Sequence, residues 1–114
     1  MENKRRQGSH YESLAAAHLV SEGMTILERN FRSRMGEIDL IAKDGETICF
    51  VEVKGRRDDV FGDPSEAVNA AKQMVIRRTA QWYLMKNRLP EDTPCRFDVV
   101  SICGDEVRLI RDAF

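Results

Sequence analysis

The fold is decided by Gly36-Glu37-Ile38-Asp39-Leu40-Ile41-Ala42 and by Thr47-Ile48-Cys49-Phe50-Val51-Glu52-Val53-Lys54. Both runs are rich in β-branched and other apolar residues, which favour strands. Between them stands Lys43-Asp44-Gly45-Glu46, and Asp-Gly between two such runs is a strong hairpin signal. The sequence therefore predicts two antiparallel strands joined within residues 43–46.

A helix and a strand are expected before this hairpin. Ser9 and Glu12 have the spacing of a capping box, and apolar residues follow on one side of the chain to about Glu22. Gly23 suits the end of that helix. Residues 24–32 then alternate roughly between apolar and polar, which predicts the first strand.

A second helix and two further strands are expected after the hairpin. The stretch Asp63-Pro64-Ser65-Glu66 offers a cap, a proline suited to the first helical position and the acid of a capping box. The predicted helix runs from there to about Asn87. Beyond two prolines, Cys95 to Cys103 is typical of a buried strand, and residues 107–110 form a last strand after a Gly-Asp turn.

The order α-β-β-β-α-β-β predicts a single α/β domain with a mixed central sheet flanked by helices. The long second helix can serve as a crossover, which would make the third and fourth strands parallel. A chain of 114 residues can bury one core and has no room for a second. Residues 1–7 are expected to be flexible.

Composition excludes several classes of protein. Hydrophobic residues make up 42%, too many for a disordered chain, and no apolar stretch approaches the roughly 20 residues that span a bilayer. No secretory signal follows the N-terminus, so a cytoplasmic protein with no membrane partner is expected. Three cysteines without metal-ligand spacing predict reduced, buried side chains. The net charge of −1 argues against bulk coating of nucleic acid.

Charged residues inside the two apolar strands are the anomaly in this sequence. With Asp44-Gly45 as a two-residue turn, Glu37 would face Glu52, and Asp39 would be the diagonal neighbour of Glu52 at roughly 7–8 Å. Lys54 would project from the same side, since it lies two residues beyond Glu52. The pattern predicts that these four side chains share one face of the sheet.

Crowded carboxylates repel one another unless protons or a cation neutralise them. Mg²⁺ suits such a patch because it uses one or two carboxylates, keeps several waters and accepts phosphate oxygens as further ligands. Lys54 would then orient a water molecule or offset charge in the transition state. The residues alone leave an alternative open, in which Lys54 and a neighbouring arginine form an ion-pair ladder with the acids on a solvated face.

Other polar residues have structural explanations as well. Glu12 can complete the capping box with Ser9. Lys72 and Gln73 lie in the second helix, where such residues are more often at the surface. Trp82 is expected in the packed end of this helix and not in a base-stacking platform.

Four motifs in order carry a family resemblance: residues 36–42, Phe50-Val51-Glu52-Val53-Lys54, Phe61-Gly62-Asp63-Pro64-Ser65-Glu66-Ala67-Val68 and Arg96-Phe97-Asp98-Val99-Val100. From about Gly8 to Ile102 the chain resembles the YraN family of small bacterial proteins, whose biological role is uncharacterised. That family is similar in turn to the restriction-endonuclease-like superfamily, often written PD-(D/E)XK, and especially to archaeal Holliday-junction resolvases.

The resemblance implies a restriction-endonuclease-like α-β-β-β-α-β core and a metal-dependent phosphodiesterase site. It makes Asp39 and Glu52 ligands of Mg²⁺ or Mn²⁺, with the carbonyl of Val53 as a further ligand. It also implies that Lys54 assists the water and that Glu12 approaches the site from the first helix.

The first helix departs from the family pattern, which usually reads Gly-x-x-Gly-Glu, because Tyr11 precedes Glu12 here. Lys72 and Gln73 fall at the motif-bearing start of the second helix. Their place there gives Lys72 and Gln73 some support as site residues, whereas the departure in the first helix leaves Glu12 less well matched than the strand residues.

The leading hypothesis is a divalent-metal-dependent nuclease, or a nuclease-like nucleic-acid-binding protein, acting on structured or branched DNA. The candidate nucleic-acid contacts are Arg32, Arg34, Arg56, Arg57, Lys72 and Gln73. Resolvases pair two active sites through a symmetric dimer, so a homodimer is expected if that analogy holds. The rival is a non-catalytic module that keeps the nuclease fold and binds nucleic acid or protein. A third hypothesis, another acid–base hydrolase, has less support because carboxylate pairs of that kind need no adjacent lysine.

Overall fold

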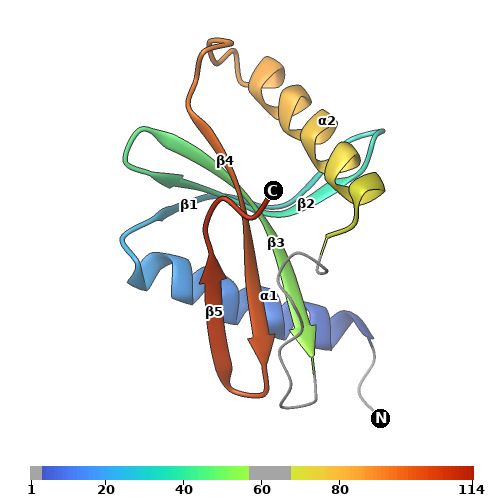
Figure 1. Cartoon of the computed structure of the whole chain (residues 1–114), viewed down its shortest axis with the longest axis vertical. Coiled ribbons are helices and arrows are strands. Elements are labelled where there is room, and N and C mark those ends of the chain that lie inside the picture. Colours follow the sequence, from blue (N-terminus) through green and yellow to red (C-terminus); the bar gives the residue numbers. More distant parts are fainter. Residues whose placement is uncertain (1–3, 57–67) are drawn as a thin grey trace.

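The computed structural model describes residues 4–56 and 68–114 and confirms the predicted order of elements. These elements are α1 (Lys4–Ser21), β1 (Thr25–Arg32), β2 (Glu37–Asp44), β3 (Thr47–Arg56), α2 (Ala70–Lys86), β4 (Cys95–Cys103) and β5 (Glu106–Ile110). They form one compact α/β domain, with the helices packed against a central sheet (Figure 1).

The sheet contains five strands in the order β1-β2-β3-β4-β5. Strands β3 and β4 are parallel, and the other neighbouring pairs are antiparallel. The chain between β3 and β4 contains α2, so the predicted parallel crossover is confirmed. This mixed topology puts the two acid-bearing strands, β2 and β3, next to each other inside the sheet.

Each face of the sheet is covered by one helix. Under α1, residues such as Leu19 and Val51 form one core cluster. Under α2, Phe31, Phe50 and Tyr83 belong to the other cluster. The ring of Tyr83 packs edge-on against both phenylalanines, with ring centroids 5.3 Å from Phe31 and 5.9 Å from Phe50. Because alternate residues of β3 enter opposite clusters, the strand is buried on both faces.

The hairpin register differs from the prediction by two residues. The observed pairs include Asp44 with Thr47 and Leu40 with Val51, which leaves Gly45 and Glu46 as the turn. Gly45 has φ of +60°, the left-handed value that primed hairpin turns require at their first central position. The prediction that placed Asp44 in the turn was therefore wrong, although a register shift of two residues does not by itself move side chains to the opposite face.

Both helices begin at other residues than predicted. Helix α1 starts at Lys4, so Ser9 lies inside it and cannot cap its N-terminus. Helix α2 starts at Ala70, and the Asn69 side chain caps it by accepting a hydrogen bond from the backbone N–H of Lys72 at 2.9 Å. The predicted cap at residues 63–66 lies outside the described residues.

The Arg96-Phe97-Asp98 motif has a structural role on β4. The carboxylate of Asp98 is fully buried and accepts hydrogen bonds from Arg96 Nε at 2.9 Å and from the backbone N–H of Asp112 at 2.8 Å. Arg96 also donates to Asp44 at 3.0 Å, which ties β4 to the hairpin. Cys95, next to this network, is exposed, so the prediction of burial was wrong for this cysteine.

In the described part of the chain, no helix is both long enough and apolar enough to cross a membrane.

Candidate functional site

Four elements bring polar side chains together where β2 begins and β3 ends. Asp39 lies near the start of β2, and Glu52 and Lys54 lie near the end of β3. Lys72 reaches this point from the first turn of α2, and Glu12 reaches it from α1. The site therefore depends on residues far apart in the sequence.

Glu52 is the centre of the charged cluster. Only 6% of it is exposed, and its Oε1 lies 2.5 Å from the ammonium of Lys72 and 3.9 Å from that of Lys54. A buried carboxylate is costly without such partners. Lys72 thus serves as the main counterion of Glu52, a contact that the sequence did not predict.

Asp39 lies on the strand next to Glu52, and its Oδ2 accepts a hydrogen bond from the backbone N–H of Val53 at 2.8 Å. Burial, and secondly the charge of Glu52, raise the pKa of Asp39 to about 7, although the bond from Val53 acts in the opposite direction. Burial is therefore the main reason that Asp39 holds a proton more readily than an exposed aspartate, and repulsion from Glu52 adds to it.

The two lysines of the cluster respond differently to burial. The pKa of Lys54 is lowered by burial and then by the nearby charge of Lys72, and Glu52 only partly compensates. Burial alone would also lower the pKa of Lys72, but its hydrogen bond and charge interaction with Glu52 raise it overall. Lys72 is therefore firmly cationic, whereas Lys54 is the lysine more ready to lose a proton.

Glu12 and Asp39 line a small hollow of about 120 Å³ together with Tyr11, Val53 and Gly55. Burial raises the pKa of Glu12, while the charge of Arg29 and a hydrogen bond from Asn30 lower it. The sequence allowed two roles for Glu12, a capping residue of the first helix or a member of the site. The structure places it beside Asp39 and, with the helix starting earlier, removes the capping explanation.

Tyr11 and Gly55 form a contact that the sequence analysis missed. A Cβ atom on Gly55 would collide with the ring of Tyr11, so this close approach of α1 to β3 requires glycine. Tyr11, where the chain departs from the family pattern, thus packs against Gly55 of β3. The available signal was a glycine three residues after Glu52 and one after Lys54.

The prediction that four charged side chains share one face was wrong in part. Even-numbered residues of β3 before the site, such as Phe50, enter the cluster under α2, and Glu52 follows them to its ion pair with Lys72. Asp39 instead lines the hollow on the α1 side. The reason is irregular alternation in β2, where Leu40 enters the α1 cluster but Ile38, two residues earlier, enters the α2 cluster.

The residues present fit an open cation site better than a closed cage. Across residues 4–56 and 68–114, no group of three or more histidine, cysteine or acidic side chains is arranged to hold a metal ion. Mg²⁺ commonly binds through only one or two carboxylates, with waters and phosphate oxygens as its other ligands. Asp39 and Glu52 supply two, since they lie on adjacent strands and close enough for the charge of Glu52 to raise the pKa of Asp39.

The remaining predicted contacts are scattered. Exposed Arg32 and Glu37 form an ion pair at 3.3 Å, and Gln73 donates to the backbone carbonyl of Val68 at 2.9 Å. Arg34 is exposed and lines a separate hollow, Arg56 is the last residue of β3, and Arg57 lies outside the described residues.

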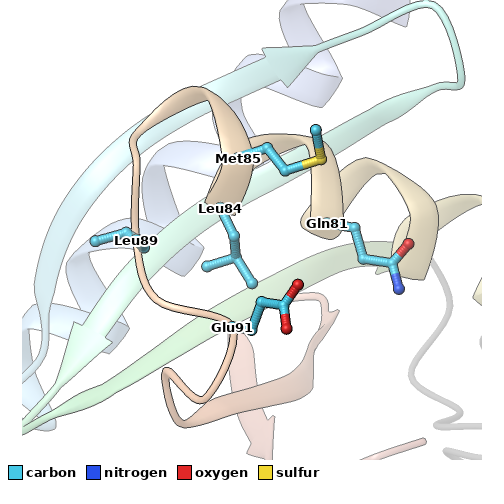
Figure 2. Close-up of a pocket in the computed structure, with 5 residues that line it drawn as sticks. All are labelled: Gln81, Leu84, Met85, Leu89 and Glu91. Atoms are coloured by element: carbon cyan, nitrogen blue, oxygen red, sulfur yellow. The ribbon is translucent and has the colours of Figure 1, made fainter.

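A second hollow, of about 400 Å³, lies at the C-terminal end of α2 (Figure 2). It is lined by Gln81, Leu84, Met85, Leu89 and Glu91, and Figure 2 shows the side chain of Leu84 pointing toward Glu91. Glu91 is the one ionisable group among these described lining residues. The hollow therefore lacks the paired charges that distinguish the strand-end site.

The fold and the site define a class of protein: a single mixed α/β domain whose strand ends carry two carboxylates between two lysines, with a third acid nearby. The chain belongs to the uncharacterised protein family UPF0102, whose family model matches residues 11–102. This is the YraN family, so the resemblance drawn from the four motifs is confirmed.

Similar proteins carry the same family designation. A UPF0102 protein of Lachnoclostridium phytofermentans is 49% identical over 112 residues, covering 98% of this chain and 95% of the relative. A UPF0102 protein of Syntrophus aciditrophicus is 48% identical over 118 residues, covering 100% and 92%. One from Alkaliphilus oremlandii is 50% identical over 99 residues, covering 86% and 85%. These names state no activity.

Proposed function

We propose that this protein is a divalent-metal-dependent nuclease that hydrolyses phosphodiester bonds in structured or branched DNA. The observation that carries this proposal is the pair of carboxylates, Asp39 and Glu52, on adjacent strands beside two lysines. After burial, the charge of Glu52 is the second cause of the raised pKa of Asp39, and a hard divalent cation would offset that repulsion between the two carboxylates. The order of helices and strands, which matches the nuclease core implied by the family resemblance, supports the same function.

Each side chain of the site has a role in this chemistry. Asp39, Glu52 and the carbonyl of Val53 would hold Mg²⁺ or Mn²⁺, which when bound polarises a phosphoryl oxygen and lowers the pKa of a coordinated water. Val53 positions Asp39 through its N–H, and Lys72 positions Glu52. Lys54 orients the attacking water or offsets negative charge in the transition state.

Glu12 is an accessory acid in this proposal. It shares a hollow with Asp39, and burial raises its pKa. A carboxyl whose pKa moves toward neutrality is better suited to exchange a proton with water during hydrolysis.

Nucleic acid is the proposed partner, with DNA favoured by the resemblance to junction resolvases. Arg32, Arg34, Arg56 and Arg57 remain proposed phosphate contacts, and their loss should reduce the salt dependence of binding. Lys72 and Gln73 are weaker candidates for this role because both already have partners within the protein. We expect a cytoplasmic protein and, by the same resemblance, a homodimer.

Cleavage of labelled DNA in Mn²⁺ tests the proposal. The substrates are single-stranded, duplex, flap and four-way-junction DNA, and the wild-type chain is compared with Glu52→Gln, which keeps the size of the side chain but removes its charge. Because a metal-binding carboxylate acts in every turnover, we expect a loss of at least about a hundredfold. Glu46→Gln, which makes the same change in the exposed hairpin turn, is the matched control.

Cleavage by all three preparations alike would identify a contaminating nuclease and contradict the proposal. Cleavage by the wild type and Glu46→Gln, but not by Glu52→Gln, would establish the activity and identify its substrate structure.

A second candidate is a non-catalytic module that binds nucleic acid or a protein partner. The ion pair between Lys72 and Glu52 favours it, since an ammonium at 2.5 Å already neutralises the buried acid in the way a structural ion pair would. Binding of DNA by wild type and Glu52→Gln with equal affinity, without cleavage by either, would support this candidate over the nuclease.

A further inference from the structure

A hollow of about 520 Å³ lies between the β1–β2 turn and helix α2. It is lined by Ser33, Arg34 and Met35 from the turn and by Trp82 from the helix. Trp82 is 43% exposed and Met35 is 42% exposed. The prediction that Trp82 belongs to the packed end of the helix was therefore wrong, because this ring is open to solvent on one side.

The turn that forms one wall of the hollow is held firmly. The backbone N–H of Ser33 donates to the carbonyl of Gly36 at 2.8 Å, and the N–H of Met35 donates to the Ser33 hydroxyl at 3.1 Å. A Cβ atom on Gly36 would collide with Val75 Cγ1 of α2, so the turn lies directly against the helix. The hollow is thus a preformed feature and needs no rearrangement to exist.

Two arginines lie at or near this hollow. Arg34 lines it, and Arg78 precedes Trp82 by one helical turn on the same face of α2. Both arginines are exposed, and among the described residues neither forms an ion pair. An open aromatic ring near two guanidinium groups that form no ion pair within the described residues is complementary to a ligand that is flat, apolar on its faces and anionic at its edge.

A further depression lies between the hollow and the start of β2, where Asp39 stands. This shallower depression of about 270 Å³, lined by Arg32, Ser33, Gly36 and Glu37, shares Ser33 with the hollow and ends two residues from Asp39. Along α2, Trp82 follows Lys72 by ten residues, which is about 15 Å at the rise of an α-helix. A flexible strand of a few nucleotides could therefore contact Trp82 while its phosphate reaches the acids.

We propose that this hollow binds an unpaired nucleotide of a DNA strand, with the base stacked on Trp82 and its phosphates contacted by Arg34 and Arg78. Stacking of bases on aromatic side chains beside a basic track is how proteins bind single strands without reading sequence. The inference rests on the proposed function and narrows it: the preferred substrate carries a single-stranded segment next to the cleaved bond.

The competing occupant is a second copy of this chain. Met35, Met74 and Met85 are also exposed around α2, and methionines are common at protein interfaces. Arg34 and Arg78, which form no ion pair within the described part of the chain, favour nucleic acid, because a second copy would bring these arginines of both chains toward the same interface. Self-association is therefore an outcome of the test and not part of the proposal.

Fluorescence of the full-length chain tests the proposal, because Trp82 is its only tryptophan. The protein is titrated in EDTA, where no cleavage competes, with a twelve-nucleotide oligothymidylate and with a blunt duplex of equal length. We expect saturable quenching of Trp82 by the single strand and weaker binding of the duplex. Affinity for a labelled single strand, measured by anisotropy, should fall about tenfold in Trp82→Ala.

Three variants separate stacking from other effects. Trp82→Phe should retain most of the affinity, and Met85→Ala, which removes another exposed apolar side chain from the same helix, should retain all of it. Arg34→Ala should lower the slope of log affinity against log salt by about one.

Equal affinity of the single strand for wild type and Trp82→Ala, or the absence of quenching, would overturn the proposal. A dimer of the wild type in sedimentation that is lost in Trp82→Ala would also overturn it, because the hollow would then bind a second copy of the chain. Failure of the nuclease proposal would instead appear as retained, Trp82-dependent binding without cleavage in Mn²⁺, so the two can be told apart.

Discussion

At the scale of single residues, Asp39 links stability to pH. Burial and the charge of Glu52 raise its pKa from 3.8 to about 7, so between these values the folded chain holds a proton that the unfolded chain has released. The contribution of Asp39 to the free energy of unfolding should therefore fall as pH rises from about 4 to about 7, by at most about 4 kcal/mol, and stay constant above that.

Thermal denaturation of wild type and Asp39→Asn from pH 5 to pH 8 measures this contribution. The asparagine can still accept the hydrogen bond from Val53, but it cannot titrate. The Tm difference between the two proteins should favour the variant increasingly as pH rises to about 7. Asp92→Asn, at an exposed acid, is the control, and a difference of the same pH dependence there would contradict the assignment to Asp39.

Single residues also mark the limit of the sequence analysis at the site. Asp39, Glu52 and Lys54 could be singled out because each interrupts an apolar strand. The ion pair of Lys72 with Glu52 could not, since nothing in a helical sequence says which residue of another element its side chain will meet. The burial of Trp82 was predicted wrongly for the same reason. A tryptophan in a helix is expected in the core unless its neighbours in the folded chain are known.

At the scale of elements, the packing of the β1–β2 turn on α2 depends on Gly36. An added Cβ would collide with Val75 Cγ1, so Gly36→Ala should push the turn away from the helix and lower stability by about 1–3 kcal/mol. Urea denaturation measures the change. The same variant should weaken single-strand binding at Trp82, since it displaces one wall of the hollow.

A second-site change provides the control for Gly36→Ala. Val75→Ala removes the atom that would be struck, and Val75 is 36% exposed, so its own cost should be small. The double variant should therefore recover the part of the lost stability that is due to the collision, while the strain of alanine at the φ of +155° remains. If the losses in unfolding free energy of the two single variants simply add in the double variant, the collision with Val75 is not the cause of the loss in Gly36→Ala.

The elements themselves were largely predictable, and their boundaries were less so. The order, the buried strand β4 and the parallel crossover follow from apolar runs separated by turn residues, and all are confirmed. The start of α2 at Ala70 was missed although Asn69 is a good N-cap. Residues 63–66 offered a cap, a proline and a capping-box acid together, and this pattern predicts an earlier start of the helix. The hairpin register was missed because Asp-Gly does not determine whether glycine takes the first or second turn position.

At the scale of the whole molecule, a divalent cation should stabilise the folded chain. The site exists only when α1, α2 and the hairpin are assembled, so an ion that binds there shifts the folding equilibrium by mass action. At a hundred times its Kd, Mn²⁺ should add about 2.7 kcal/mol, which for a domain of this size raises Tm by several degrees.

Calorimetry with and without Mn²⁺ checks this expectation in the wild type and in Asp39→Ala. The shift should be lost in Asp39→Ala and retained in Asp105→Ala, which removes an exposed acid from the β4–β5 turn. Equal shifts in all three proteins would show that Mn²⁺ binds elsewhere or only weakly at the surface.

The sequence by itself determined the α/β class, the order of elements, the family and the three charged strand residues, because these follow from local patterns of polarity and from turn residues along the chain. Only the tertiary structure decided that Lys72 neutralises Glu52, that Glu12 stands beside Asp39 and that Trp82 opens onto a basic hollow. These contacts join residues of separate elements, so they depend on how α1 and α2 pack on the two faces of one irregular sheet.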